Sequence, residues 1–386
     1  MLPSLRVQAV QTPVIPLVAE MIRAHPGTIS LGQGVVHYGP PPSAMRRVGD
    51  FFSDAENHKY KAVDGLPGLK QALSEKLLAE NAIRVSAENP LVVTAGGNMA
   101  FVNALLAIAD PGDEIILLTP YYFNHEMAVR LANCVPVAVA TDSAHQPDLQ
   151  KIQDAITRRT RAVVTVSPNN PTGAVYARET LSAINALCRE RGLYHISDEA
   201  YSAFVFEGAR HFSPASLDSS AGHTISLFSL SKSHGFASWR IGWMVLPRAL
   251  LESVMKIQDT ILICPPVISQ VAAEGALNGG GDYVRSQISG IAAVRADALA
   301  LLRTIPELCS VTRSQGALYF FLRLNLELEP MTLIERLIRE HRVALMPGHA
   351  FGAAGCCARV SFGALQAGTI HEGIGRLVEG LKTIVK

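Results

Sequence analysis

Short apolar runs alternate with longer amphipathic stretches between residues 91 and 247. The runs cover residues 91–95, 114–120, 135–140, 162–167, 194–200, 223–231 and 241–247. Several are apolar at consecutive positions, which predicts strands covered on both faces. In the intervening segments, such as AFVNALLAIAD and ETLSAINALCRERG, apolar residues recur every three or four positions, which predicts helices. The alternation predicts an α/β fold with a mostly parallel, doubly wound seven-stranded sheet.

The pattern changes after about residue 250. Two helical stretches lead into the strand candidates GALYFFLRL, VALMPG and ARVSFG. We expect residues 45–284 to form a large α/β domain, and residues 1–44 together with 285–386 to form a smaller α+β domain. The glycine run 279–281 is expected to be a connector or a helix C-cap rather than a phosphate loop.

Composition places the chain among folded globular proteins. Of its 386 residues, 48% are hydrophobic and 17% are charged, which is far from the composition of disordered chains. The 34 basic and 33 acidic residues give a net charge of +1 with no basic block, so we expect no nucleic-acid partner. No segment approaches the roughly 18 consecutive apolar residues of a membrane helix, and the first residues lack the pattern of a secretion signal.

The six cysteines do not have the spacing of a disulfide framework. Four are isolated and are expected to be core thiols: Cys134, Cys188, Cys264 and Cys309. The adjacent pair Cys356 and Cys357 is expected to be part of a loop before a strand. These features favour a reducing, cytoplasmic location, and we expect no metal site among the cysteines or the 12 histidines.

The segment SLSKS places Lys232 at the end of an apolar strand. Burial lowers the pKa of a lysine amine and makes it a nucleophile suited to Schiff-base formation. Ser229 and Ser231 upstream and Arg240 downstream could hold one phosphate dianion near that amine. Taken alone, the same residues could be a strand-end lysine beside a solvated arginine.

Two further segments follow predicted strands. The turn residues of SPNNPTG, residues 167–173, would aim the amide of Asn170 into a cleft, although an ordinary turn would have the same composition. SDEAY places Asp198 and Tyr201 where both can reach one crevice at the strand end. DEA also resembles the acidic motif of nucleotide hydrolases, but the chain has no GxxxxGK loop, so that interpretation fails.

In this order and at these spacings, SPNNPTG, SDEAY and SLSKSHGFASWRIG resemble the motifs of class I/II aminotransferases, the fold-type-I pyridoxal-phosphate (PLP) enzymes. The resemblance extends over essentially the whole chain through ISLGQG, YKAVDGLPGLKQAL, TAGGNMA, TPYYFNHEMA, PGHAFG and RVSFG. Each motif alone is weak, whereas the ordered series is specific. The resemblance implies a homodimeric enzyme that uses pyridoxal 5′-phosphate to move an amino group between an amino acid and a 2-oxo acid by a ping-pong mechanism.

The resemblance also implies roles for individual residues. Lys232 would hold the cofactor covalently and move a proton, and Asp198 would keep the pyridinium nitrogen protonated. Asn170 and Tyr201 would donate hydrogen bonds to the phenolate oxygen of the cofactor.

The resemblance assigns the rest of the site as well. The other implied cofactor-binding groups are Ser229, Ser231, Arg240 and the backbone of Gly97 and Asn98 at the phosphate, Tyr122 on the ring, and Tyr60 from the neighbouring subunit. Arg359 would clamp the substrate carboxylate near the backbone of Gly34, and Asn170 would also bind the substrate. The choice of Tyr122 over Tyr121 depends on the alignment of the Pro120 step.

Four other residues near these motifs are expected to be ordinary loop groups without a role in the reaction. They are His37, Tyr38, His125 and His234.

The loop after Gly34 is expected to bring Val35, Val36 and Tyr38 to the substrate side chain, and it contains no arginine for a second carboxylate. Because ISLGQGVVHYGPPP and TPYYFNHEMA also resemble aminotransferases that prefer methionine or aromatic residues, we expect donors with large uncharged side chains.

Two other functions fit parts of the resemblance. PLP-dependent C–S lyases and cyclopropane-forming synthases share the scaffold and the cofactor residues and form one alternative. A cofactor-sensing transcription regulator is disfavoured, because the resemblance begins by about residue 13 and leaves no room for a DNA-binding domain in front.

Overall fold

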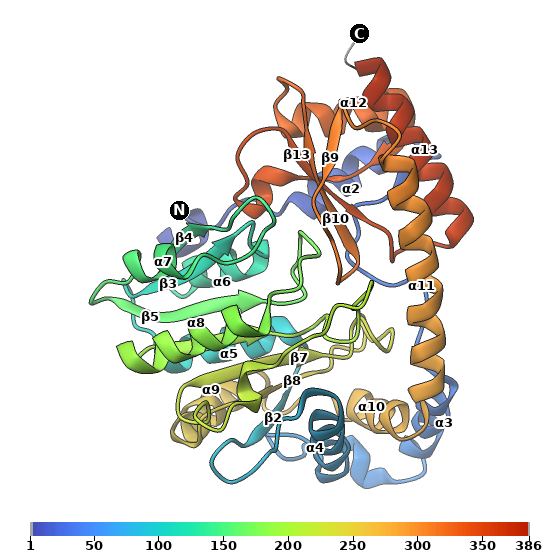
Figure 1. Ribbon diagram of the computed structural model, residues 1–386. Helices are drawn as coiled ribbons and strands as arrows, with labels where there is room; N and C mark the ends of the chain where they lie inside the picture. The colour runs from blue at the N-terminus through green and yellow to red at the C-terminus, as the bar shows by residue number, and fades with distance from the viewer. Residues whose placement is uncertain (1–2, 385–386) are drawn as a thin grey trace.

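A seven-stranded sheet forms the centre of the larger part of the molecule (Figure 1). The computed structural model describes residues 3–384. The strands are β2 (Leu91–Thr94), β3 (Glu114–Thr119), β4 (Val135–Ala140), β5 (Thr160–Val166), β6 (Tyr194–Asp198), β7 (Thr224–Ser229) and β8 (Gly242–Val245). Their order is β2-β8-β7-β6-β5-β3-β4. Only β8 is antiparallel to its neighbours, so the predicted mostly parallel seven-stranded sheet is confirmed.

Helices cover both faces of this sheet. The α-helices of both parts of the molecule, within residues 3–384, are α1 (Leu5–Gln8), α2 (Val14–Ala24), α3 (Pro42–Phe51), α4 (Pro67–Asn81), α5 (Gly97–Ile108), α6 (Phe123–Leu131), α7 (Leu149–Asp154), α8 (Arg178–Arg191), α9 (Leu251–Leu262), α10 (Val267–Gly279), α11 (Gly281–Leu302), α12 (Pro330–His341) and α13 (Ala367–Ile384). Successive strand side chains point to opposite faces. In β3, Ile115 and Leu117 pack with α5, α6 and α9, whereas Ile116 and Leu118 pack with α7 and α8. Both faces are therefore buried, which explains the continuous apolar runs.

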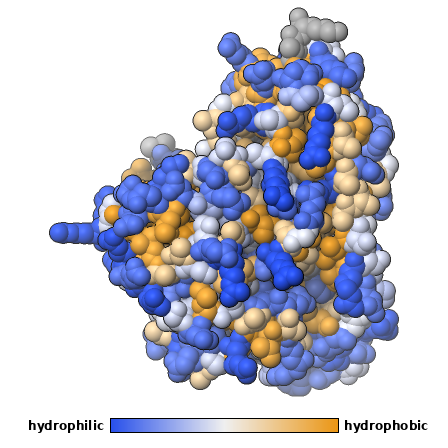
Figure 2. Space-filling model, viewed as in Figure 1, coloured by the Kyte–Doolittle hydropathy of each residue, from blue (hydrophilic) through white to orange (hydrophobic). Residues whose placement is uncertain are grey.

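The surface carries both polar and apolar side chains. Figure 2 shows hydrophilic residues over most of one face, with apolar residues in small separate groups. The exposed large apolar side chains include Ile15, Leu17, Tyr60, Ile261 and Ile263. Within residues 3–384, no helix combines the length and apolarity needed to cross a membrane.

A four-stranded antiparallel sheet lies in the smaller part of the molecule, in the order β12-β13-β10-β9. Its strands are β9 (Cys309–Val311), β10 (Tyr319–Leu324), β12 (Met346–Pro347) and β13 (Cys357–Ser361). A separate parallel pair joins β1 (Ile29–Ser30) to β11 (Val343–Ala344), so the N-terminal segment is fixed to the C-terminal part. The strand candidates GALYFFLRL and ARVSFG correspond to β10 and β13, whereas VALMPG is divided between β11 and β12.

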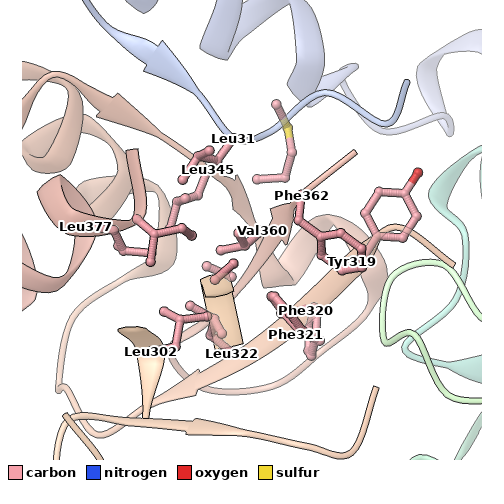
Figure 3. Packing of buried hydrophobic residues seen from close by; sticks show 14 of the residues in the cluster. Leu31, Leu302, Tyr319, Phe320, Phe321, Leu322, Leu345, Val360, Phe362 and Leu377 are labelled. Carbon is pink, nitrogen blue, oxygen red and sulfur yellow. The ribbon is translucent and has the colours of Figure 1, made fainter. Parts of the chain in front are cut away.

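An extensive apolar cluster holds this smaller part together (Figure 3). Leu322 of β10 and Val360 of β13 pack with Leu31 of the N-terminal segment, Leu302 at the end of α11 and Leu377 of α13. The long helix α11 runs from the region of α3 and α10 to α13 (Figure 1). The domain boundary proposed from the sequence, between residues 284 and 285, lies within the first turns of this helix.

The glycine run 279–281 and the six cysteines have definite places in the fold. Gly279 ends α10 and Gly281 begins α11, as expected for a connector. The six cysteines are buried free thiols, and Cys356 lies directly before β13, which begins at Cys357.

Candidate active site

The carboxyl ends of β5, β6 and β7 form one wall of a cavity of about 340 Å³. Since these three strands are adjacent and parallel, the segments that follow them meet at one edge of the sheet. Every residue predicted to bind the cofactor or the substrate carboxylate lines the cavity except Tyr60: Gly34, Gly97, Asn98, Tyr122, Asn170, Asp198, Tyr201, Ser229, Ser231, Lys232, Arg240 and Arg359. Tyr60 lies in a loop and is 77% exposed.

Lys232 lies between the two parts of the molecule. Its Nζ donates a hydrogen bond to the carbonyl oxygen of Gly34, in the N-terminal segment. Burial lowers the pKa of the Lys232 amine to about 8, and the positive charges of Arg359 and Arg240 act in the same direction, whereas Asp198 opposes them. A lysine with this pKa is partly neutral near physiological pH and can act as a nucleophile.

Asp198 is held by His125, for which no role was expected. The Nε2 atom of His125 lies 3.1 Å from Oδ2 of Asp198, and the backbone N–H of Ala200 donates to Oδ1 at 3.0 Å. His125 is 3% exposed, and its ring stacks on Phe101 with the centroids 3.9 Å apart. The expectation of an ordinary loop histidine is therefore wrong. The available signal was helical spacing, because His125 and the buried Val129 are four residues apart on the same face of α6.

Tyr38 and His234 are also buried, contrary to expectation. The Tyr38 hydroxyl contacts the carbonyl oxygens of Lys232 and Ser233 at 3.1 and 3.2 Å. This close packing requires Gly235, which has a φ of 69° and whose Cβ, if present, would lie 2.6 Å from the Tyr38 carbonyl oxygen. His234 Nδ1 lies 2.8 Å from the Ser233 hydroxyl, and burial lowers the pKa of His234 to about 3.

The apolar wall of the cavity differs from the predicted one. Of the three residues expected there, only Val35 lines the cavity, whereas Val36 and Tyr38 do not. Tyr38 is turned toward the backbone that follows the lysine, as described above. Two residues that the sequence did not suggest, Ile15 of α2 and Phe123 of α6, complete the apolar part of the wall.

Arg359 is almost completely buried, with 2% of its surface exposed. Its Nη1 donates to Oδ1 of Asn170 at 2.8 Å and its Nη2 to the carbonyl oxygen of Gly32 at 2.7 Å. The guanidinium also lies 4.4 Å from the ring centroid of Tyr319 and 4.9 Å from that of Phe351. Its Nε has no hydrogen-bond partner within residues 3–384. A buried cation with an unpaired donor is suited to an anionic ligand, such as a carboxylate.

Donor groups suited to an anion also line the cavity where α5 begins. Gly96 precedes the helix with a φ of 85°, and no side chain caps its first N–H groups. A Cβ at Gly96 would collide with the Arg240 guanidinium, so only glycine allows this close approach. Ser229 Oγ donates to Ser231 Oγ at 2.9 Å beside the helix. Uncapped N–H groups, hydroxyls and a guanidinium are the donors that bind a phosphate.

Tyr122 faces the cavity, whereas Tyr121 packs against Gly352 in the position that a side chain there would occupy. The Tyr122 hydroxyl accepts a hydrogen bond from Asn124 at 2.8 Å and donates to Asn98 at 3.4 Å. Burial raises the pKa of Tyr122 to about 12, so this phenol remains protonated.

The charged groups of the lining are three cations and one carboxylate: Lys232, Arg240, Arg359 and Asp198. An excess of positive charge suits ligands that carry a phosphate and a carboxylate. The chain matches the family model for aminotransferases of class I and II over residues 26–377. The chain belongs to this family. It is therefore a PLP-dependent aminotransferase, and the family and fold expected from the sequence are confirmed.

Relatives with different substrate names cover nearly the whole chain. The Arabidopsis thaliana aromatic aminotransferase ISS1 is 30% identical over 391 residues, which is 99% of this chain and 97% of the relative. The probable aspartate/prephenate aminotransferase of Aquifex aeolicus is 35% identical over 335 residues, 84% of each protein. A solved Thermus thermophilus aspartate aminotransferase double mutant has 30% identity and a TM-score of 0.88, and covers 98% of this chain and 100% of its own.

The cavity of this aminotransferase fits pyridoxal phosphate. The uncapped start of α5 with Arg240 offers a phosphate site, and Lys232 has a lowered pKa. The carboxylate of Asp198 could pair with a cationic ring nitrogen. The unpaired Nε of Arg359 could bind a substrate carboxylate.

Proposed function

We propose that this aminotransferase takes its amino group from amino acids with large uncharged side chains, such as methionine or the aromatics. The observation that carries this proposal is the lining of the cavity, to which Ile15, Val35 and Phe123 contribute apolar surface. The other two cations of the lining, Lys232 and Arg240, belong to the proposed cofactor site. A substrate with a second carboxylate would find no further cation among the described residues that line the cavity.

We propose that the enzyme uses a ping-pong mechanism with a 2-oxo acid as acceptor, in which the site residues have the following roles. Bound PLP supplies an attachment point for amino groups and an electron sink for the substrate Cα. Lys232 anchors it and then moves a proton to and from the substrate carbon. Asp198, fixed by His125, keeps a proton on the ring nitrogen. Tyr201 and Asn170 donate hydrogen bonds to the ring oxygen.

The remaining proposed contacts orient the two reactants. Ser229, Ser231, Arg240 and the start of α5 bind the phosphate, and Tyr122 lies against the ring. Arg359 binds the substrate carboxylate, beside the backbone of Gly34. The cavity walls come from both parts of the molecule, so the two reactants are held where these parts meet.

Substrate preference tests this proposal directly. We expect kcat/KM for phenylalanine and methionine to exceed that for aspartate by at least about 10-fold, because burying a large apolar side chain contributes about 1.5–3 kcal/mol. Ile15→Ala should lower kcat/KM for phenylalanine, whereas Leu17→Ala, a partly exposed neighbour on α2 outside the lining, should not. A preference for aspartate would contradict the proposal and indicate a cation from another subunit.

We further propose a cytoplasmic homodimer whose sites are shared between subunits. Tyr60 is 77% exposed, and its loop is joined to the end of α9 by a hydrogen bond of 2.6 Å from Gln258 to the carbonyl oxygen of Val63. Ile261 and Ile263 at that end of α9 are 50% and 38% exposed. Exposed aromatic and β-branched side chains on adjoining segments support a subunit contact here. The buried free thiols support a reducing compartment.

Complementation between inactive variants tests the shared site. If Tyr60 serves the partner's cofactor, mixed dimers of Tyr60→Ala and Lys232→Ala subunits contain one intact site each. After unfolding and refolding together, the mixture should regain about one quarter of wild-type activity, from random pairing in a two-fold dimer. A mixture of Asp198→Ala and Lys232→Ala, which both affect the site of their own subunit, is the control and should regain none. Failure of the first mixture to regain activity would contradict the role of Tyr60.

A further inference from the structure

Tyr319 connects the small sheet to the site on the large sheet, although the sequence motifs assign it no role. It begins β10 and is completely buried. Figure 3 shows its ring at the edge of the apolar cluster, with the hydroxyl directed away from the cluster. That hydroxyl lies 2.6 Å from the hydroxyl of Tyr201, which follows β6. Both tyrosines line the cavity.

The direction of this hydrogen bond decides what Tyr201 can do. Each hydroxyl has one proton, so one tyrosine donates and the other accepts. The guanidinium of Arg359 lies 4.4 Å from the Tyr319 ring centroid, and a cation over a phenol ring stabilises negative charge on it. Arg359 lowers the pKa of both phenols, but it lies over the ring of Tyr319, and this geometry favours Tyr319 as the donor.

The pKa values of the two phenols agree with this direction. Burial raises both, and the bond to Tyr319 raises the pKa of Tyr201 further. The charge of Arg359 and the hydrogen bond to Tyr201 lower the pKa of Tyr319 and so oppose the effect of burial.

We propose that Tyr319 is a positioning residue that donates a hydrogen bond to the Tyr201 oxygen. The hydroxyl proton of Tyr201 is then directed into the cavity, toward the ring oxygen of the cofactor. This inference rests on the proposed role of Tyr201. A hydroxyl that accepts one hydrogen bond becomes a stronger donor in the next, so the pair should polarise the ring oxygen more than Tyr201 alone.

Gly34 keeps this pair closely packed. A Cβ at Gly34 would lie 2.6 Å from the Tyr319 hydroxyl oxygen and 3.7 Å from Nη2 of Arg359. The close approach of the backbone covers the hydroxyl and leaves it with Tyr201 as its partner. The segment that accepts the Lys232 hydrogen bond thus also encloses the tyrosine pair.

The proposed effect can be measured at the cofactor without turnover. Donation to the ring oxygen withdraws negative charge and makes the nearby cofactor-linked nitrogen of Lys232 more acidic. The absorbance of the holoenzyme reports this titration. In Tyr319→Phe, we expect the midpoint pH of this absorbance titration to rise by at least roughly 0.3 pH units, because Tyr319 no longer polarises Tyr201. The other titratable and charged groups near the tyrosine pair and Lys232 are Tyr122, Asp198, Arg240 and Arg359, and the variant leaves all of them in place.

Two further variants separate positioning from packing. In a Tyr201→Phe background, Tyr319→Phe should cause no further shift, since its effect acts through Tyr201. Tyr194→Phe, which removes a partly buried hydroxyl outside the cavity, is the matched control and should leave the midpoint unchanged. If Tyr319→Phe does not fold, 3-fluorotyrosine at position 319, a stronger acid of nearly the same shape, should lower the midpoint.

The outcomes distinguish this inference from the proposed function. A fall in the midpoint, or no change, in Tyr319→Phe would overturn the inference, because a fall means that Tyr201 normally donates to Tyr319. An unchanged midpoint in Tyr201→Phe would instead overturn the proposed role of Tyr201. A wild-type holoenzyme whose absorbance does not arise from a cofactor on Lys232 would overturn the assignment of the lysine.

Discussion

Replacing Lys232 with alanine is expected to lower kcat by several orders of magnitude while the protein still binds PLP. The loss has two sources, because the amine both anchors the cofactor and moves the proton, and proton transfer by a positioned group alone contributes about 10²–10⁴-fold. The phosphate-binding groups around Ser229 and Arg240 are unchanged in this variant, so part of the affinity should remain. Single-turnover kinetics with phenylalanine and a spectroscopic binding titration would measure the two effects separately.

The attachment site gives an independent measurement. Borohydride reduction of the wild-type holoenzyme, followed by peptide mapping, should find the pyridoxyl group on Lys232. Because the pKa of the free amine is about 8, attachment to the apoenzyme should become faster as the pH rises through 8, where the neutral nucleophile becomes the main form. Lys76→Ala, at a lysine outside the cavity lining, should behave as wild type. Label on any other lysine would contradict the assignment.

The second large effect is expected at Asp198. Asp198→Ala should bind PLP but react at least about 100-fold more slowly, since the loss of a buried charge partner costs about 3 kcal/mol and each 1.4 kcal/mol is tenfold in rate. Without the carboxylate, the ring nitrogen loses its proton and the ring becomes a poorer electron sink. His125 also loses its partner, so Asp198→Asn, which keeps a hydrogen-bonding side chain, tests charge separately from packing.

A carboxylate outside the cavity lining supplies the control for that experiment. Asp113, directly before β3, pairs with Arg161 at 2.8 Å, and Asp113→Ala should leave the rate constants unchanged. The measurements are the rate of the first half-reaction under single-turnover conditions and the affinity for PLP. Wild-type rates in Asp198→Ala would show that this carboxylate does not act on the ring.

Local patterns in the sequence predict the main sheet and the polar residues that follow its strands at the cavity. The strands of the large sheet are buried on both faces, so the apolar runs mark them directly. Asn170, Asp198 and Lys232 follow adjacent parallel strands, and their meeting at one edge is a consequence of the topology. A local pattern was therefore enough to bring these residues together.

Pairings between distant segments could not be predicted in this way. His125 lies in a helix and meets Asp198 only after that helix packs on α5, and Tyr38 meets the backbone of Lys232 across the interface of the two parts. Nothing in the neighbouring residues identifies such partners. The strands β1 and β11 have two residues each, which is too short for any period of apolar residues to appear.

The pairing of β1 with β11 also determines when the site can form during synthesis. Ile29 lies opposite Val343, so the segment that carries Gly34 has no partner strand until almost the whole chain has been made. Contacts between residues so far apart in sequence form late, because a large loop must close first. The large sheet can be completed earlier, whereas the substrate-binding wall can only be assembled on a nearly finished chain. A nascent or truncated protein that ends before β11 would expose this part of the cavity to solvent and to chaperones.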